Sequence, residues 1–138
     1  MDVNHLIEAF RRLRPEMTAE MLTPEGANGM CHYVSAAFAD LALSEGMTNV
    51  DLVVVEGLRE PMPNGSHPIE TIWNEVWHVV ARVGNTYVDW TARQFDRDAN
   101  VPTMTSADEI SSRWLLVQPY DDYIAEEDAM AAAYEQAA

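Results

Sequence analysis

The sequence contains a single cysteine among its 138 residues, which excludes an internal disulfide and any zinc site built from several cysteines. Proteins that keep their thiols reduced are typically intracellular. Residues 1–5 lack the basic segment and apolar run that begin a secretory signal, and no apolar stretch is long enough to span a membrane. We therefore expect a cytoplasmic (intracellular) protein with no membrane partner.

Basic residues are also scarce. Lys and Arg number 8 against 23 Asp and Glu, which gives a formal net charge of −15. Nucleic-acid binding gains its affinity from cationic contacts with phosphates, so we expect no nucleic-acid partner. Strong acidity is compatible with a basic protein partner or substrate, although most charge of this kind is simply solvated surface.

The chain length and a hydrophobic content of 48% fit a single domain over residues 1–138. Helical spacing of apolar residues predicts an amphipathic N-terminal helix over residues 3–13. Its apolar positions are Leu6, Ile7, Phe10 and Leu13. An acidic, alanine-rich end predicts a C-terminal helix over residues 122–136. Its expected anchors are Ile124, Met130 and Tyr134.

The one cysteine lies where a glycine-rich loop, residues 26–30, meets a strongly helical stretch. Val34 and Phe38 follow Cys31 at i+3 and i+7, so the apolar stripe of a helix over residues 31–44 begins at the cysteine. A thiol at a helix N-terminus is close to the positive end of the helix dipole, which favours the thiolate. An isolated cysteine on an apolar stripe is also commonly a small core residue, so both interpretations stay open.

Four short β-rich runs predict the strands of a sheet. A β-branched run covers residues 49–56, and a later run covers residues 114–118. Between them, residues 76–83 and 86–90 flank Gly84-Asn85 and predict an antiparallel hairpin. The elements together predict an α+β protein.

The hairpin brings a histidine and a carboxylate together. If Gly84 and Asn85 form a two-residue turn, counting outward makes Val80 face Asp89. Residues two apart share a face, so His78 lies diagonally across from Asp89 on that same face. A one-residue bulge would place the two side chains on opposite faces, so the pairing depends on the turn.

These residues supply the parts of nucleophilic catalysis by cysteine. Cys31 is the candidate nucleophile, His78 assists formation of its thiolate, and Asp89 orients His78. The backbone N–H of Cys31, with the side chain of Asn28 or a loop amide such as that of Gly29, would receive the oxyanion. Each residue also has a structural explanation: a core cysteine, a strand histidine bonded to backbone, and an aspartate that caps a turn.

Three further residues are weaker candidates. Trp77 would line a groove beside the catalytic histidine, although aromatic residues on strands are more often core. His67 lies in a Pro- and Gly-rich loop over residues 57–72, which is either a binding loop or a connector. His32 is a rival base, but the next residue on a helix points roughly 100° away from Cys31. Zinc held by the cysteine, histidine and aspartate is a further, less favoured alternative.

The same residues resemble the transglutaminase-like branch of the papain-like cysteine hydrolases. The resemblance consists of Gly-x-Cys at a helix start, followed by Trp77-His78-Val79, Tyr87-Val88-Asp89 and Thr91-Ala92-Arg93-Gln94-Phe95. It covers residues 26–95, about half of the chain, and differs where His32 and Tyr33 follow the cysteine in place of the family's usual aromatic neighbour. It implies a cysteine-bearing helix packed on an antiparallel sheet of about four strands, and activities that include peptidase, amidase, deamidase and acyl transferase.

Two functions follow from these features. The first is a cysteine-dependent hydrolase or acyl transferase that acts on an amide bond of a peptide or protein, with no cofactor and no metal. The second is a non-catalytic protein, a pseudoenzyme, that keeps the scaffold and binds a basic partner through its acidic surface.

Overall fold

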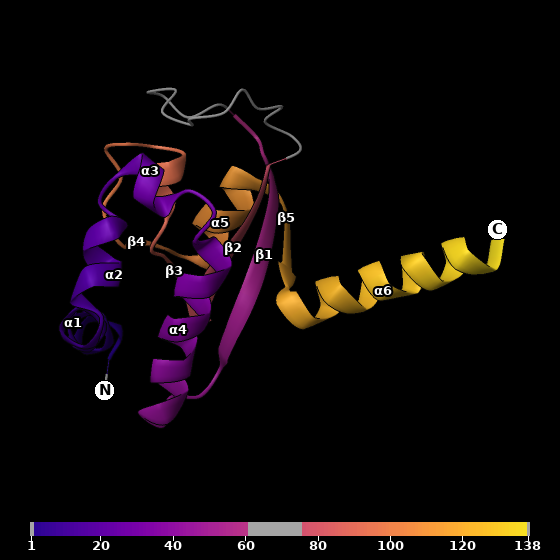
Figure 1. Ribbon diagram of the computed structural model, residues 1–138. Helices are drawn as coiled ribbons and strands as arrows, with labels where there is room; N and C mark the ends of the chain where they lie inside the picture. The colour runs from indigo at the N-terminus through magenta and orange to yellow at the C-terminus, as the bar shows by residue number, and fades with distance from the viewer. Residues whose placement is uncertain (1, 61–75, 138) are drawn as a thin grey trace.

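The computed structural model describes residues 2–60 and 76–137, and within them helices cover an antiparallel sheet (Figure 1). The helices are α1 (Val3–Leu13), α2 (Pro15–Glu20), α3 (Pro24–Ala27), α4 (Cys31–Ser44), α5 (Ala107–Arg113) and α6 (Tyr120–Ala137), with a 3-10 turn η2 (Ala92–Gln94). The strands are β1 (Val50–Leu58), β2 (Trp77–Val83), β3 (Thr86–Asp89), β4 (Thr103–Thr105) and β5 (Trp114–Pro119). The described strands form one sheet in the order β4-β3-β2-β1-β5. The fold is therefore α+β, as predicted.

Helix α4 lies along β2 and β1 and forms the main core (Figure 1). Val34, Phe38 and Ala42 are fully buried on the face that the apolar stripe predicts. The Phe38 ring meets Phe10 of α1 edge-on at 5.3 Å between centroids and lies 5.6 Å from Trp90. The cysteine-bearing helix thus packs on the antiparallel sheet, with α1 closing the core from outside.

The hairpin has the predicted turn and register. Val83 pairs with Thr86, and Ala81 pairs with Val88, so Gly84 and Asn85 alone connect the strands. Gly84 has φ +63, a left-handed conformation that glycine adopts without strain at the first position of such a turn. The parity that puts His78 and Asp89 on one face is therefore correct.

The structure adds two short elements to the predicted ones, at the sheet edge and before the cysteine. Beside the four predicted strands, the described sheet contains β4, whose residues Thr103–Thr105 pair with β3. Residues 24–27, which overlap the start of the glycine-rich loop, form the short helix α3, capped by the Thr23 side chain. Both elements are only three or four residues long, too short for periodicity to reveal.

The terminal helices also differ from expectation in their contacts. Helix α1 spans residues 3–13 as predicted, but Leu13 is exposed rather than part of its buried face. Helix α6 extends away from the body (Figure 1), and its expected anchors Ile124, Met130 and Tyr134 are 36%, 67% and 80% exposed. Tyr120 and Tyr123 hold its first turn instead, by packing near Cys31 and Val54.

None of the helices in the part of the chain that the structure describes has the length and apolar character needed to cross a membrane.

Candidate active site

Cys31 is the first residue of α4 and lies against the start of β2. Gly29, with φ +76, turns the chain into the helix two residues earlier. The Cys31 side chain is 7% exposed and packs with Val54 and Val79. One turn later, the buried Ser35 hydroxyl donates a hydrogen bond of 3.2 Å to the Val79 carbonyl. The first turn of α4, and with it the thiol, is thereby fixed to β2.

His78 is completely buried at the beginning of β2. Its Nε2 lies 2.9 Å from Oδ2 of Asp89, across the hairpin. The imidazole ring meets Phe95 edge-on at 4.9 Å between centroids and lies nearly parallel to the indole of Trp114 at 5.9 Å. These aromatic neighbours exclude water and restrict the ring to one orientation.

Asp89 is the last residue of β3, and its carboxylate is held by the turn that follows. The backbone N–H and the hydroxyl of Thr91 both donate to Oδ1, at 3.0 and 3.3 Å. Oδ1 is therefore occupied locally, and Oδ2 is left for His78. The arrangement suits a carboxylate that orients an imidazole through one nitrogen.

Gln94 is a further residue of the site, and the sequence indicated it only as part of the resembling motif. It lies on η2 and is 5% exposed, and its Nε2 is 2.8 Å from Nδ1 of His78. With the His78 Nε2–H donating to Asp89, the Nδ1 lone pair accepts from the Gln94 amide. In the sequence, Gln94 is marked only by its place in the Thr91-Ala92-Arg93-Gln94-Phe95 motif, five residues after Asp89.

The site shifts the pKa values of its thiol and imidazole in opposite directions. Burial would raise the pKa of Cys31, but a hydrogen bond with His78, the charge of that ring and a backbone hydrogen bond at Val79 lower it below its ordinary value of 9.0. Burial would lower the pKa of His78, but the charge and hydrogen bond of Asp89, with a contribution from Cys31, raise it to about 10. The two shifts together favour a thiolate beside an imidazolium.

The weaker candidate residues fall into different positions. Asn28 and Gly29 are exposed in the loop directly before α4. Trp77 shares a face of β2 with Val79, and its ring lies 6.2 Å from that of Tyr123. His32 stacks obliquely on Tyr120 at 5.0 Å rather than joining His78. His67 lies outside the described residues.

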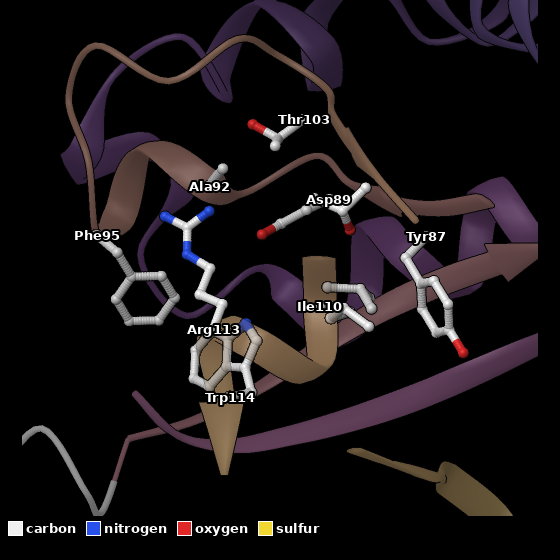
Figure 2. Close-up of a pocket in the computed structure, with 10 residues that line it drawn as sticks. Tyr87, Asp89, Ala92, Phe95, Thr103, Ile110, Arg113 and Trp114 are labelled. Atoms are coloured by element: carbon white, nitrogen blue, oxygen red, sulfur yellow. The ribbon is translucent and has the colours of Figure 1, made fainter. Parts of the chain in front are cut away.

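A small cavity lies behind Asp89 (Figure 2). Asp89, Thr103 and Arg113 approach it from β3, β4 and α5, beside Phe95 and Trp114. Its volume of 20 Å³ is about that needed for a single water. The cavity is therefore part of the surroundings of Asp89 and is too small to receive a substrate.

Metal ligation has no geometric basis in the region that the structure describes. No group of three or more His, Cys, Asp or Glu side chains among those residues is arranged to hold a metal ion, and Cys31, His78 and Asp89 are all among them.

No protein-family model and no curated protein matches the chain. Among solved structures, the chain is similar to the catalytic domain of the Salmonella virulence factor SseI, with a TM-score of 0.49 and 20% sequence identity. The match covers 79% of this chain and 63% of that chain, so the chain corresponds to less than two thirds of the SseI structure.

Proposed function

We propose that this protein is a cysteine-dependent hydrolase or acyl transferase that acts on an amide bond of a peptide or protein. Cys31 is the nucleophile, His78 the acid and base, and Asp89 the residue that orients His78. The supporting observation is the buried His78 ring, hydrogen-bonded to Asp89 and interacting with Cys31, with its pKa raised to about 10 while that of Cys31 is lowered.

In the proposed reaction, the Cys31 thiolate attacks the carbonyl carbon of the amide and forms a tetrahedral oxyanion. Backbone N–H groups at the start of α4 have no partner within the helix, so they are available to this oxygen. The His78 imidazolium gives its proton to the leaving amine, and the carbon–nitrogen bond breaks to leave a thioester. His78 then takes a proton from water or an acceptor amine, which attacks the thioester and restores the thiolate.

Gln94 affects which protonation state of His78 is stable. When Nδ1 carries a proton for the thiolate, the Gln94 amide must turn its oxygen toward the ring or give up the contact, because an N–H group cannot donate to an N–H group. With its N–H toward Nδ1, Gln94 favours the neutral ring, whereas Asp89 favours the charged one.

The pH dependence of Cys31 alkylation by iodoacetamide tests the proposed function. In the wild type we expect the thiolate form to persist well below the pKa of a free thiol, about 8.5, and His78→Ala to move the profile up toward it. His32→Ala is the matched control, since it removes an imidazole adjacent to Cys31 without touching the Asp89 contact. Because Cys31 is buried, the position of the profile on the pH axis is compared rather than the absolute rate. An ordinary profile that His78→Ala leaves unchanged contradicts the proposed function.

A non-catalytic acidic interaction protein is the second candidate, and helix α6 favours it. The helix has six acidic residues and no Lys or Arg, and it exposes Met130 and Tyr134 to solvent. This function predicts a complex with a basic partner that weakens with salt and is unaffected by Cys31→Ala.

A further inference from the structure

A groove runs along α4 on the side away from the main core. It lies between α4, the start of β1 and the junction of β5 with α6, and its volume is 240 Å³. Small and aliphatic side chains form its walls, among them Ala36, Ala39, Leu43 and Leu52. The groove is an order of magnitude larger than the cavity behind Asp89, so an extended side chain or peptide segment fits here and not there.

The polar rim of the groove is acidic. Asp40, Asp51 and Asp121 contribute carboxylates from α4, β1 and α6. Asp51 is paired with Arg82, whereas Asp40 and Asp121 are exposed to solvent. An apolar floor with a carboxylate rim matches a lysine or arginine, whose aliphatic stem packs on apolar surface while its charged end stays at the rim.

The groove continues toward Cys31. Leu52 and Tyr120 line the groove and also pack against the cluster of Cys31, Val54 and Val79. Asp40 follows Cys31 by nine residues on α4, which is about 13 Å along the helix axis and, at roughly 100° per residue, about half a turn around it. An extended peptide rises about 3.3 Å per residue, so at least about four residues are needed to reach from Cys31 to Asp40.

We propose that this groove binds the substrate on one side of the reacting amide and selects a lysine or arginine at least about four residues from it. The proposal rests on the proposed function, because it assigns the groove to the substrate of Cys31. Its occupant is an extended, basic segment of the peptide or protein that is acted on.

Alkylating peptides of graded length test the proposed spacing directly, because they attach covalently to Cys31. The probes are iodoacetyl peptides that end in lysine amide after zero to six alanines, each compared with the same peptide ending in glutamine amide. Both members of a pair alkylate Cys31 by the same displacement of iodide, so their rate ratio reports the contribution of the lysine and not the activation of the thiol. We expect a ratio of about fivefold at a preferred spacing of three or more alanines, as one favourable charge contact provides, and a ratio closer to one at zero alanines.

Variants identify the source of the preference. Asp40→Asn and Asp121→Asn each should reduce the ratio at the preferred spacing. Asp122→Asn is the matched control, because it removes the same charge from the same first turn of α6 but does not line the groove. A ratio that is independent of spacing, or one that Asp122→Asn lowers as much as Asp121→Asn, overturns the proposal and indicates general attraction to an acidic protein.

A binding measurement without chemistry provides a second test. In Cys31→Ala protein, acetyl-Ala-Ala-Ala-Lys-amide should shift the backbone amide resonances of Leu43 and Leu52, and Asp40→Asn should reduce these shifts. If these resonances do not change at millimolar peptide concentrations, the proposal that the groove binds this peptide is wrong. The iodoacetamide pH profile is a separate measurement of the proposed function. If the rate ratio depends on spacing but the pH profile is that of an ordinary thiol, the groove still binds the basic segment and His78 has no catalytic role.

Discussion

Helices α4 and α6 are the two longest helices of the described chain, yet their surroundings are opposite. Along α4, residues Val34, Phe38 and Ala42 are fully buried, and Ser35 is bonded to β2. Along α6, only the first turn packs against the body, through Tyr120 and Tyr123. The spacing of apolar residues therefore predicts which face of a helix is apolar. Tertiary packing determines whether another element covers that face.

The two helices also differ in their relation to the proposed active site. The α4 helix positions a thiol whose pKa depends on a ring from another strand. The outer part of α6 has charge and exposed side chains such as Met130 and Tyr134. Changes in α4 should thus affect stability and thiol chemistry together, and changes along the outer part of α6 should affect neither.

The largest expected effect comes from Phe38→Ala. The ring is buried between Phe10 and Trp90, so its removal leaves a cavity and should lower the free energy of unfolding by about 3–5 kcal/mol. Urea unfolding followed by tryptophan fluorescence measures the change. A loss below about 1 kcal/mol would contradict the packing of α4.

The next largest expected effect is the change with pH in the free energy of unfolding of Cys31→Ala. His78 has a pKa of about 10 in the folded protein against 6.5 for the free side chain, so its contribution is complete below pH 6.5 and is lost as pH rises through 10. Cys31, with a lowered pKa, contributes stability above pH 9.0 that is lost as pH falls through its folded value. In the wild type the two effects oppose each other, because folding favours loss of the thiol proton and retention of the ring proton.

Between about pH 7 and pH 9, the free energy of unfolding should therefore fall less steeply with rising pH in the wild type than in Cys31→Ala, because the lowered pKa of the thiol offsets the raised pKa of the ring. Without the thiol, the remaining His78 effect should make stability fall with rising pH, by at most about 1.4 kcal/mol per unit. Urea unfolding at several pH values measures both slopes. Equal slopes in the two proteins would show that the thiol does not offset the effect of the ring.

The smallest effect is expected for Tyr134→Ala on α6. This side chain is 80% exposed, so its removal should change the free energy of unfolding by no more than about 0.5 kcal/mol. The same urea experiment gives the comparison with Phe38→Ala. A loss above about 1 kcal/mol would mean that the outer part of α6 packs against the protein in solution.

The features that were predictable from the sequence depend on local geometry. The helix that begins at Cys31 follows from the spacing of its apolar residues, and the pairing of His78 with Asp89 follows from counting outward from a two-residue turn. The Gln94 contact was not predictable in this way, because η2 returns the side chain to a ring sixteen residues earlier. Strand β4 pairs with β3 across a connecting segment of irregular structure, and three residues give no pattern.

The groove was also beyond prediction, since its walls come from α4, β1 and the β5–α6 junction, which only tertiary packing brings together. In the sequence, the stretch around Cys31 alone favours a core thiol, and the hairpin that pairs His78 with Asp89 reverses that preference in favour of a nucleophile. The two differ physically in one respect: a core thiol needs no charged neighbour, whereas the proposed nucleophile depends on the His78 ring.

The most direct test of that dependence is the titration of the His78 imidazole by NMR in the wild type and in Cys31→Ala. The proposed site predicts an imidazole that stays protonated well above pH 6.5 in the wild type, with a pKa of about 10, and a lower pKa once the thiolate is removed. A ring that titrates at or below pH 6.5, with the same value in both proteins, would contradict the thiolate–imidazolium pair.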